Sequence, residues 1–140
     1  MADFPVNLKQ VYFTRTIVVA NPNHRPDLSA PVRMAPQNEI NVQKLEDAEN
    51  EYVVSMRTRF NPESDPSEGY TIDMECVALF DVLNISGDEA LKAVSIVGHN
   101  VVYGAIREAV LWITGRHPFG ALAFGLSVLE PKKADSKEPS

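Results

Sequence analysis

The stretch from Val94 to Ile113, VSIVGHNVVYGAIREAVLWI, decides the fold of this chain. Its apolar residues have the spacing of a helix, yet its clearly polar members are only Ser95, His99, Asn100, Arg107 and Glu108. A helix on the surface of a monomer carries a polar face over roughly half of its circumference, and this one has too few polar residues for that. We therefore expect one side to pack on a sheet and the other on a second copy of the chain, across a two-fold axis. The residues expected at that contact are Val101, Val102, Ile106, Val110 and Ile113.

Local signals set the limits of this helix. Ser86 and Glu89 have the spacing of a capping box, which predicts where the helix begins. Glycine weakens helices, so we expect a break near Gly98, and Gly115 marks the end. The apolar segment Ala121–Leu129 follows. It is the alternative cover for the helix, because a chain whose own tail folds back over the helix needs no second copy.

Four segments before the helix alternate between apolar and polar residues, as half-buried strands do. They are Val11–Ala20, Ile40–Leu45, Tyr52–Phe60 and Tyr70–Leu83. In the first of them, Val11, Phe13, Ile17 and Val19 are expected on one face. Prolines between the first two segments exclude a central strand there. Because all strands precede the helix, the pattern predicts an α+β fold, a four-stranded antiparallel sheet with helices packed on its apolar face.

The size and charge of the chain fit one globular domain. Its 140 residues, 44% of them hydrophobic, allow one core, which we expect over residues 1–130, followed by a disordered polar tail over residues 131–140. The net charge of −6 argues against binding to nucleic acid, which needs a basic surface. No signal peptide and no apolar run long enough to cross a bilayer are found. We therefore expect a cytoplasmic protein that does not insert into membranes.

Residues capable of catalysis are few and scattered. The histidines His24, His99 and His117 lack the spacing of metal ligands, and the single cysteine, Cys76, is expected to be an inert buried thiol within a strand. The adjacent pair Arg107-Glu108 is interpreted as an ion pair that fixes packing at a subunit contact. We expect no catalytic residues, no metal and no cofactor. A small α+β enzyme that uses His99 with Glu108 is the alternative of another class.

Several phrases of the chain, in order and at matching spacing, resemble the SecB family of protein-export chaperones. Val11–Asn23 is similar to the family's first strand and its turn, and Tyr70–Ile85 resembles its fourth strand. The sharpest match is His99–Glu108, which resembles the family's helix phrase of asparagine, two apolar residues, an aromatic-proline step and Arg-Glu. Gly115–Phe119 follows at the spacing of the turn after the helix. The resemblance runs from about Val6 to Leu129.

The resemblance implies a chaperone that works without catalysis or nucleotide. SecB proteins hold unfolded preproteins in apolar grooves and deliver them to SecA, the motor ATPase of the translocase. Their subunits pair through their sheets, and two dimers sandwich their helices into a homotetramer. Clients are expected to meet the aromatic candidates Phe13, Tyr103, Trp112, Phe119 and Phe124, together with Ile72, Met74 and Cys76, which the resemblance adds. The acidic pair Asp73 and Glu75 is the candidate for docking the motor.

The chain also departs from the family pattern. Thr16 and Ala20 stand where acids of the first strand are expected, and Gly104 replaces the proline of the helix phrase. The family's C-terminal helix is expected to be missing after Leu129, and the tail Pro131–Ser140 has little of the usual motor-binding character. These departures favour an alternative, a SecB-like chaperone dedicated to one client such as the antitoxin of a toxin–antitoxin pair.

Overall fold

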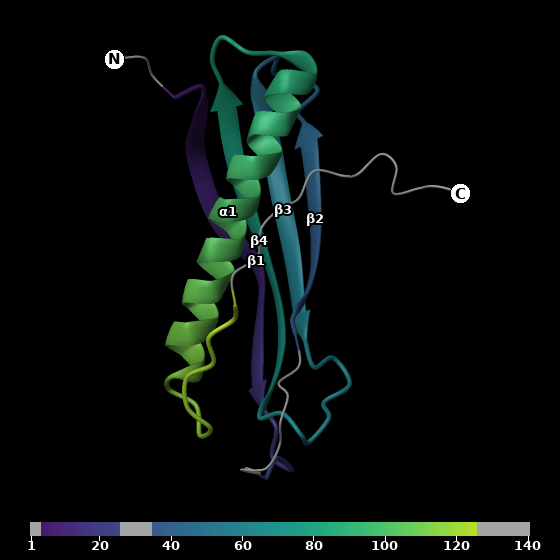
Figure 1. Ribbon diagram of the computed structural model, residues 1–140, viewed down its shortest axis with the longest axis vertical. Helices are drawn as coiled ribbons and strands as arrows, with labels where there is room; N and C mark the ends of the chain where they lie inside the picture. The colour runs from purple at the N-terminus through teal and green to yellow at the C-terminus, as the bar shows by residue number, and fades with distance from the viewer. Residues whose placement is uncertain (1–3, 26–34, 126–140) are drawn as a thin grey trace, which may run out of the picture.

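One antiparallel sheet carries one long helix on one of its faces (Figure 1). The computed structural model describes residues 4–25 and 35–125. Its elements are β1 (Val6–Ala20), β2 (Gln37–Lys44), β3 (Glu51–Phe60), β4 (Tyr70–Val82) and α1 (Gly87–Thr114). The strand order is β1-β4-β3-β2, so β1 and β2 form the two edges of the sheet. The predicted α+β fold is confirmed, with a single helix in the described part of the chain.

The central strands β3 and β4 alternate strictly between buried and half-buried residues. Their register pairs Val54 with Ala78 and Met56 with Cys76, and all four side chains are almost completely buried beneath α1. The alternation follows from the pleat of a strand, which sends successive side chains to opposite faces. The core therefore lies between the inner face of the sheet, defined as the face that carries α1, and the helix.

β1 departs from regular pairing at two places. The register with β4 shifts between Leu8 and Gln10 and again between Phe13 and Arg15. The second shift makes Thr14 an extra residue, as in a β-bulge. The expectation that Ile17 shares a face with Phe13 is therefore wrong. The residues of β1 on the inner face are Val6, Leu8, Val11, Phe13, Thr16, Val18 and Ala20, and those on the outer face include Tyr12, Ile17 and Val19.

α1 is continuous over 28 residues, so the break predicted at Gly98 does not occur. Gly98 has a packing role instead, because a Cβ atom there would lie 2.6 Å from Cγ2 of Val54. The predicted capping box is also wrong, since the Ser86 side chain makes no cap hydrogen bond. The Ser86 carbonyl accepts a hydrogen bond from the Ala90 amide at 3.3 Å.

The segment that follows α1 turns back and runs beside the helix (Figure 1). Leu122 and Phe124 are buried, and the Tyr103 hydroxyl donates to the Gly125 carbonyl at 2.8 Å. The tail thus covers one flank of α1, as the alternative prediction had it for Ala121–Leu129, although residues 126–129 lie outside the described residues. The tail predicted to be disordered, residues 131–140, lies outside them too. No helix in the described residues is long and apolar enough to cross a membrane.

Candidate functional site

The inner face of β1 exposes apolar side chains beside the helix. Leu8, Val11 and Phe13 are 43%, 41% and 37% exposed, although their partners on β4 are buried. The cause is the diagonal path of α1 across the sheet (Figure 1). In the row of the sheet that contains Val11, the helix lies over β3 instead, with Gly98 against Val54. The first half of β1 is therefore left uncovered. These three residues are called the inner strip.

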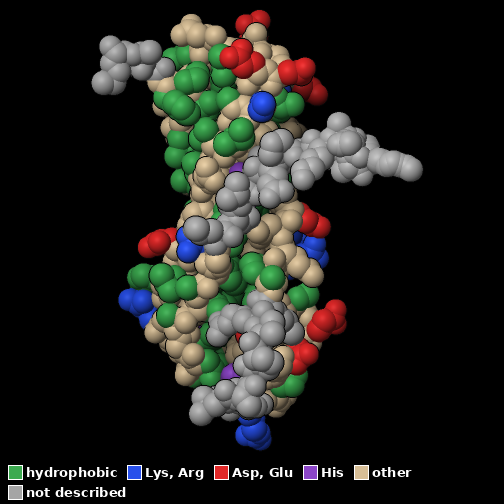
Figure 2. Space-filling view, in the orientation of Figure 1, with side chains coloured by type: hydrophobic (Ala, Val, Ile, Leu, Met, Phe, Trp, Pro, Cys, Tyr) green, Lys and Arg blue, Asp and Glu red, His purple; other side chains and the backbone are tan. Residues whose placement is uncertain are grey.

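One flank of α1 faces the inner strip. The opposite flank holds the returning tail, because the Tyr103 hydroxyl and the Arg107 Nε donate to carbonyls of that tail. The flank toward β1 carries half-buried apolar residues at every fourth position, namely Ala93, Val97, Val101, Ala105 and Ala109. In Figure 2 hydrophobic side chains gather over the first half of α1 and the neighbouring sheet edge. Strip and flank together form an elongated apolar surface.

The outer face of β1 also carries exposed apolar side chains, among polar ones. Tyr12, Ile17 and Val19 are exposed there, and β1 has no neighbouring strand on its outer side in the described residues. An edge strand with unpaired backbone groups and exposed apolar side chains is a template for association with another chain. β1 is therefore a candidate edge for pairing with another polypeptide chain.

The structure places the predicted client residues in different environments. Phe13 lies in the inner strip, and Trp112 and Phe119 are exposed at the far end of α1 and just beyond it. The others are buried and belong to the core or to the contact between helix and tail; they are Ile72, Met74, Cys76, Tyr103 and Phe124. Burial also raises the pKa of the Cys76 thiol to about 11, which keeps it protonated at neutral pH. These five side chains offer no surface to a client.

Sequence reasoning missed Leu8 and Val11 as surface residues. Their alternation with polar neighbours is the pattern of a half-buried strand, and only the diagonal path of α1 leaves them uncovered. Three of the residues predicted at the subunit contact, Val102, Ile106 and Val110, are fully buried against the sheet. Apolar residues spaced four apart identify the buried side of a helix. They do not tell whether that side packs on the chain's own sheet or on a second subunit.

The predicted acidic pair lies on the outer face among arginines. The Asp73 carboxylate accepts two hydrogen bonds from Arg57 and lies 3.6 Å from a nitrogen of Arg15. The Arg57 hydrogen bonds lower the pKa of Asp73 below its ordinary value. Glu75 accepts a hydrogen bond from the Thr14 hydroxyl at 2.7 Å. A basic partner would therefore meet carboxylates that already have partners.

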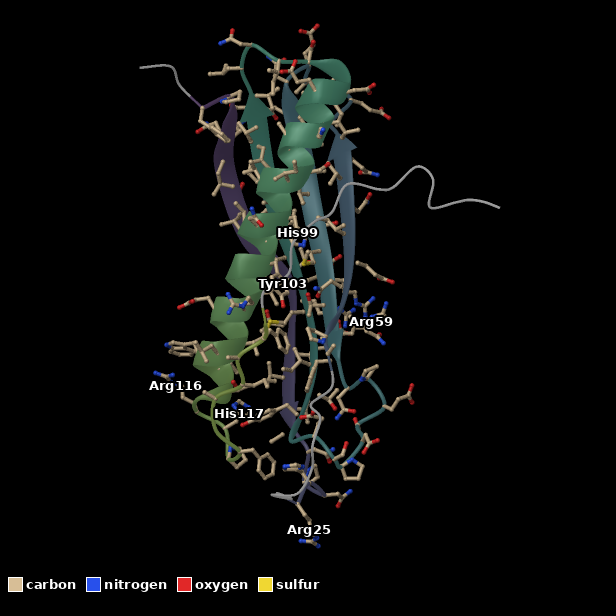
Figure 3. The ribbon with its side chains drawn as sticks, in the orientation of Figure 1. Arg25, Arg59, His99, Tyr103, Arg116 and His117 are labelled. Atoms are coloured by element: carbon tan, nitrogen blue, oxygen red, sulfur yellow. The ribbon has the colours of Figure 1, made fainter. Side chains whose placement is uncertain are left out.

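Arg59 continues this charge pattern on the outer face (Figure 3). It pairs with Glu39 at 3.1 Å, and in the register of the sheet Arg15, Glu75, Arg57 and Glu39 lie in one row across the four strands. Positive and negative side chains alternate along that row. The local balance of charge is neutral, although the whole chain is acidic.

The groups considered for catalysis are not brought together. His99 is buried and its ring stacks on Tyr103, whereas Glu108 is exposed on the outside of α1. Arg107 donates to the Phe124 carbonyl at 2.9 Å rather than forming the predicted ion pair with Glu108. His117 bonds to the carbonyl of Ile113 in the last turn of the helix (Figure 3). Residues 4–25 and 35–125 contain no cluster of three or more metal-binding side chains.

A solved structure shares this architecture over most of its length. It is the SecB-like chaperone Rv1957 of Mycobacterium tuberculosis, in complex with a ChAD peptide from the antitoxin HigA1, Rv1956. The TM-score is 0.66 at 22% identity, and the match covers 88% of this chain and 91% of the other. This chain has the fold of a SecB-like chaperone. The predicted resemblance is thereby confirmed at the level of the fold.

A second solved structure is more distant. A protein of unknown function from Streptococcus agalactiae matches with a TM-score of 0.54 at 11% identity, over 89% of this chain and 100% of the other. No protein-family model matches the sequence, and no curated protein matches it either. The shared fold is therefore recognised from the structure and not from sequence similarity.

Proposed function

We propose that this protein is a SecB-like chaperone that holds extended, apolar segments of unfolded polypeptide. It acts by binding and needs no nucleotide, metal or cofactor. The observation that carries the proposal is the inner strip, three large apolar side chains left open beside an apolar helix flank. The SecB-like neighbour bound to an antitoxin peptide supports a polypeptide as the ligand.

The chemistry of the inner strip suits clients of many sequences. Leu8, Val11 and Phe13 remain about half exposed, so their burial under a client contributes about 1 kcal/mol each. The hydrophobic effect is non-directional and does not require one client sequence. The open edge of β1 adds backbone hydrogen bonds that any extended chain can form. Such a site holds a client reversibly.

Delivery to a SecA-like translocase motor is the less favoured version of this function. The acidic docking surface expected around Asp73 is occupied by Arg57 and Arg15. A basic partner would have to displace these arginines, which lowers the gain from charge complementarity. We therefore favour a chaperone dedicated to one client or a few, with an antitoxin as the leading candidate, because the neighbouring chaperone binds an antitoxin peptide. We place the protein in the cytoplasm as a homotetramer.

The proposal is tested by the suppression of aggregation of denatured proteins and by the binding of a fluorescent, extended apolar peptide. The decisive variant is Val11→Asp, which puts a carboxylate into the inner strip. We expect about tenfold weaker peptide binding, because burying that charge costs more than 1.4 kcal/mol. The matched control is Gln10→Asp, on the outer face of the same strand.

Two results would overturn this function. One is a folded wild-type protein that suppresses aggregation of no client and binds no apolar peptide. The other is equal peptide affinity for Val11→Asp and the wild type, which would place binding elsewhere. Translocase delivery is examined separately by measuring binding of the motor ATPase to the wild type and to Asp73→Arg, where the favoured version predicts no difference.

A further inference from the structure

A cavity of about 280 Å³ opens between the start of α1 and the turn that joins β2 to β3. Apolar side chains form part of its wall; they are Tyr52, Val82, Ile85 and Leu91. Leu91 is 41% exposed, so this wall is not closed by the described residues. The cavity is smaller than the sites of about 300–1,000 Å³ that hold drug-sized ligands. Its size and apolar wall suit a side chain of a polypeptide.

The segment that returns along α1 runs toward this cavity. Its successive hydrogen bonds are with the side chains of Thr114, Arg107 and Tyr103, so it passes from the end of the helix toward its start. The ring of Phe124 lies 5.5 Å from that of Phe60 on β3, which places the segment on the flank away from β1. The cavity opens on the same flank, because residues of β2 and β3 line it.

The chain is long enough to reach the cavity. Leu91 lies twelve positions before Tyr103, which is about 18 Å along the helix axis. The Tyr103 side chain tilts toward the start of the helix over about one turn, which leaves about 13 Å. Its hydroxyl holds the Gly125 carbonyl, and four further residues in extended conformation span about 13 Å. The fourth of them is Leu129, the last large aliphatic residue of the chain.

The charges at the cavity are complementary to the residues that follow in the sequence. Glu49 and Asp88 line the cavity together with one base, Lys44. Figure 2 shows acidic side chains gathered at this end of the molecule. Residues 130–133, with the sequence EPKK, carry one acid and two bases, which is the reverse of the charge at the cavity. Opposite charges of this kind select a partner and fix its register.

We propose that residues 126–133 of the chain itself dock in this cavity, with the Leu129 side chain against its apolar wall and the two lysines at its carboxylates. These residues lie outside the described part of the chain. A segment tethered so closely has an effective concentration in the millimolar range, about a thousandfold above that of a free peptide at micromolar concentration. The docked tail covers the start of α1 and leaves the inner strip, on the opposite flank, open to clients.

The first test is limited digestion of the full-length protein with trypsin, without any client, so that its result does not depend on the proposed function. Docking protects the peptide bond after Lys133. Leu91→Asp puts a carboxylate into the wall of the cavity, and we expect it to speed this cleavage about tenfold, because cleavage follows the undocked fraction. Leu91→Met keeps the apolar contact and should retain the protection.

The matched control is Leu83→Asp, which adds the same charge to an exposed leucine at the same end of the molecule, outside the residues that line the cavity. It should leave the cleavage after Lys133 unchanged. Cleavage after Lys137, beyond the docked segment, is the internal reference for trypsin activity. Helical circular dichroism checks that each variant is folded.

The second test joins the tail to the cavity through a disulfide between Ser86→Cys and Glu130→Cys. The Ser86 side chain lines the cavity and makes no cap hydrogen bond, so its exchange disturbs little. Under mild oxidation we expect an intrachain disulfide, identified by the mass of the linked peptides. The native Cys76 is fully buried and does not compete. Ser67→Cys, exposed at the opposite end of the sheet, replaces Ser86→Cys in the control.

Three outcomes would overturn the proposal. The first is equal cleavage after Lys133 in the wild type and in folded Leu91→Asp. The second is a disulfide from position 86 that forms no faster than the control from position 67. The third is a disulfide that forms only between two chains, which would make the tail of another copy the occupant of the cavity.

Discussion

Arg57 and Asp73 face each other diagonally across β3 and β4 and form two hydrogen bonds, Nε to Oδ1 at 2.9 Å and a terminal nitrogen to Oδ2 at 2.7 Å. Both side chains are partly exposed, which limits the strength of the pair. The same pair explains why the outer face is not an acidic surface, because each carboxylate near its centre has a donor. Its contribution to stability can be measured through its pH dependence.

The first prediction concerns Asp73→Asn, which keeps the shape and removes the charge. We expect it to destabilise the folded chain by about 1 kcal/mol at neutral pH, measured by urea unfolding. The folded pKa of Asp73 lies below its ordinary value of 3.8, so the contribution is complete above that value and is lost as the pH falls through the folded pKa. The wild type and the variant should therefore become equally stable at strongly acidic pH.

The control for this measurement is Glu39→Gln, in the more exposed pair with Arg59. Its effect should stay below about 0.5 kcal/mol. A difference between Asp73→Asn and the wild type that persists unchanged in strong acid would contradict the electrostatic origin of the effect.

The second prediction concerns the hydroxyl of Tyr70, which organises the end of α1. It accepts a hydrogen bond from the Phe119 amide at 3.1 Å and donates to the Gly120 carbonyl at 2.6 Å. Tyr70→Phe leaves these groups without that partner, and should cost about 1–3 kcal/mol. We also expect faster tryptic cleavage after Arg116, because the returning tail is less firmly held. Tyr12→Phe, at an exposed site, should change neither measurement.

The third prediction compares two glycines of α1. Gly98→Ala brings a Cβ atom to 2.6 Å from Val54, and overpacking of this kind costs about 1–3 kcal/mol. Alanine returns up to about 1 kcal/mol through its helix propensity, so the net effect should be destabilising. Gly104→Ala meets no atom of its own chain and should stabilise the monomer by about 0.5–1 kcal/mol. Both are measured by thermal unfolding at a concentration where the chain is monomeric.

An unchanged or raised unfolding temperature for Gly98→Ala would show that the helix can move away from β3 at little cost. In that case the close contact with Val54 would not be what fixes the diagonal path of α1.

The fourth prediction concerns Cys76, the single thiol of the chain. It is fully buried, and burial raises its pKa to about 11. We expect a thiol reagent at pH 8 to modify the unfolded chain in urea rapidly and the native chain only at its rate of opening. Saturating amounts of an apolar peptide should not accelerate modification, because Cys76 is part of the core and not of the client surface. Rapid modification of the native protein would contradict this placement.

The sequence predicts the sheet and helix of this fold well because periodicity records burial directly. The alternation in Tyr52–Phe60 and Tyr70–Val82 matches buried and half-buried positions residue by residue. The sequence predicts a break in the long helix because a propensity scale treats Gly98 as a weak point. Its reason is tertiary, namely the space that Val54 occupies, and no local pattern contains that information.

The candidate site is harder to predict because it depends on which part of the sheet α1 leaves uncovered. Leu8 and Val11 look like any inward residues of a strand, and they are exposed only because α1 crosses the sheet diagonally. Ile72 and Met74 show the same alternation, but they are buried because α1 covers their strand, β4. Which apolar residues of the inner face remain exposed depends on the angle at which α1 packs on the sheet. Contacts between residues distant in sequence set that angle.

The extra residue at Thr14 makes β1 expose apolar side chains on two opposite faces in succession. Before it, alternate apolar side chains point toward the helix, and after it Ile17 and Val19 point to the opposite side of the sheet. A substitution scan along this strand should therefore change phase at that position. Substitutions at Val11 and Phe13 would affect contacts of the inner face, and substitutions at Ile17 and Val19 would affect contacts of the outer face. One strand with one alternating pattern can in this way address two separate molecules, without a second domain.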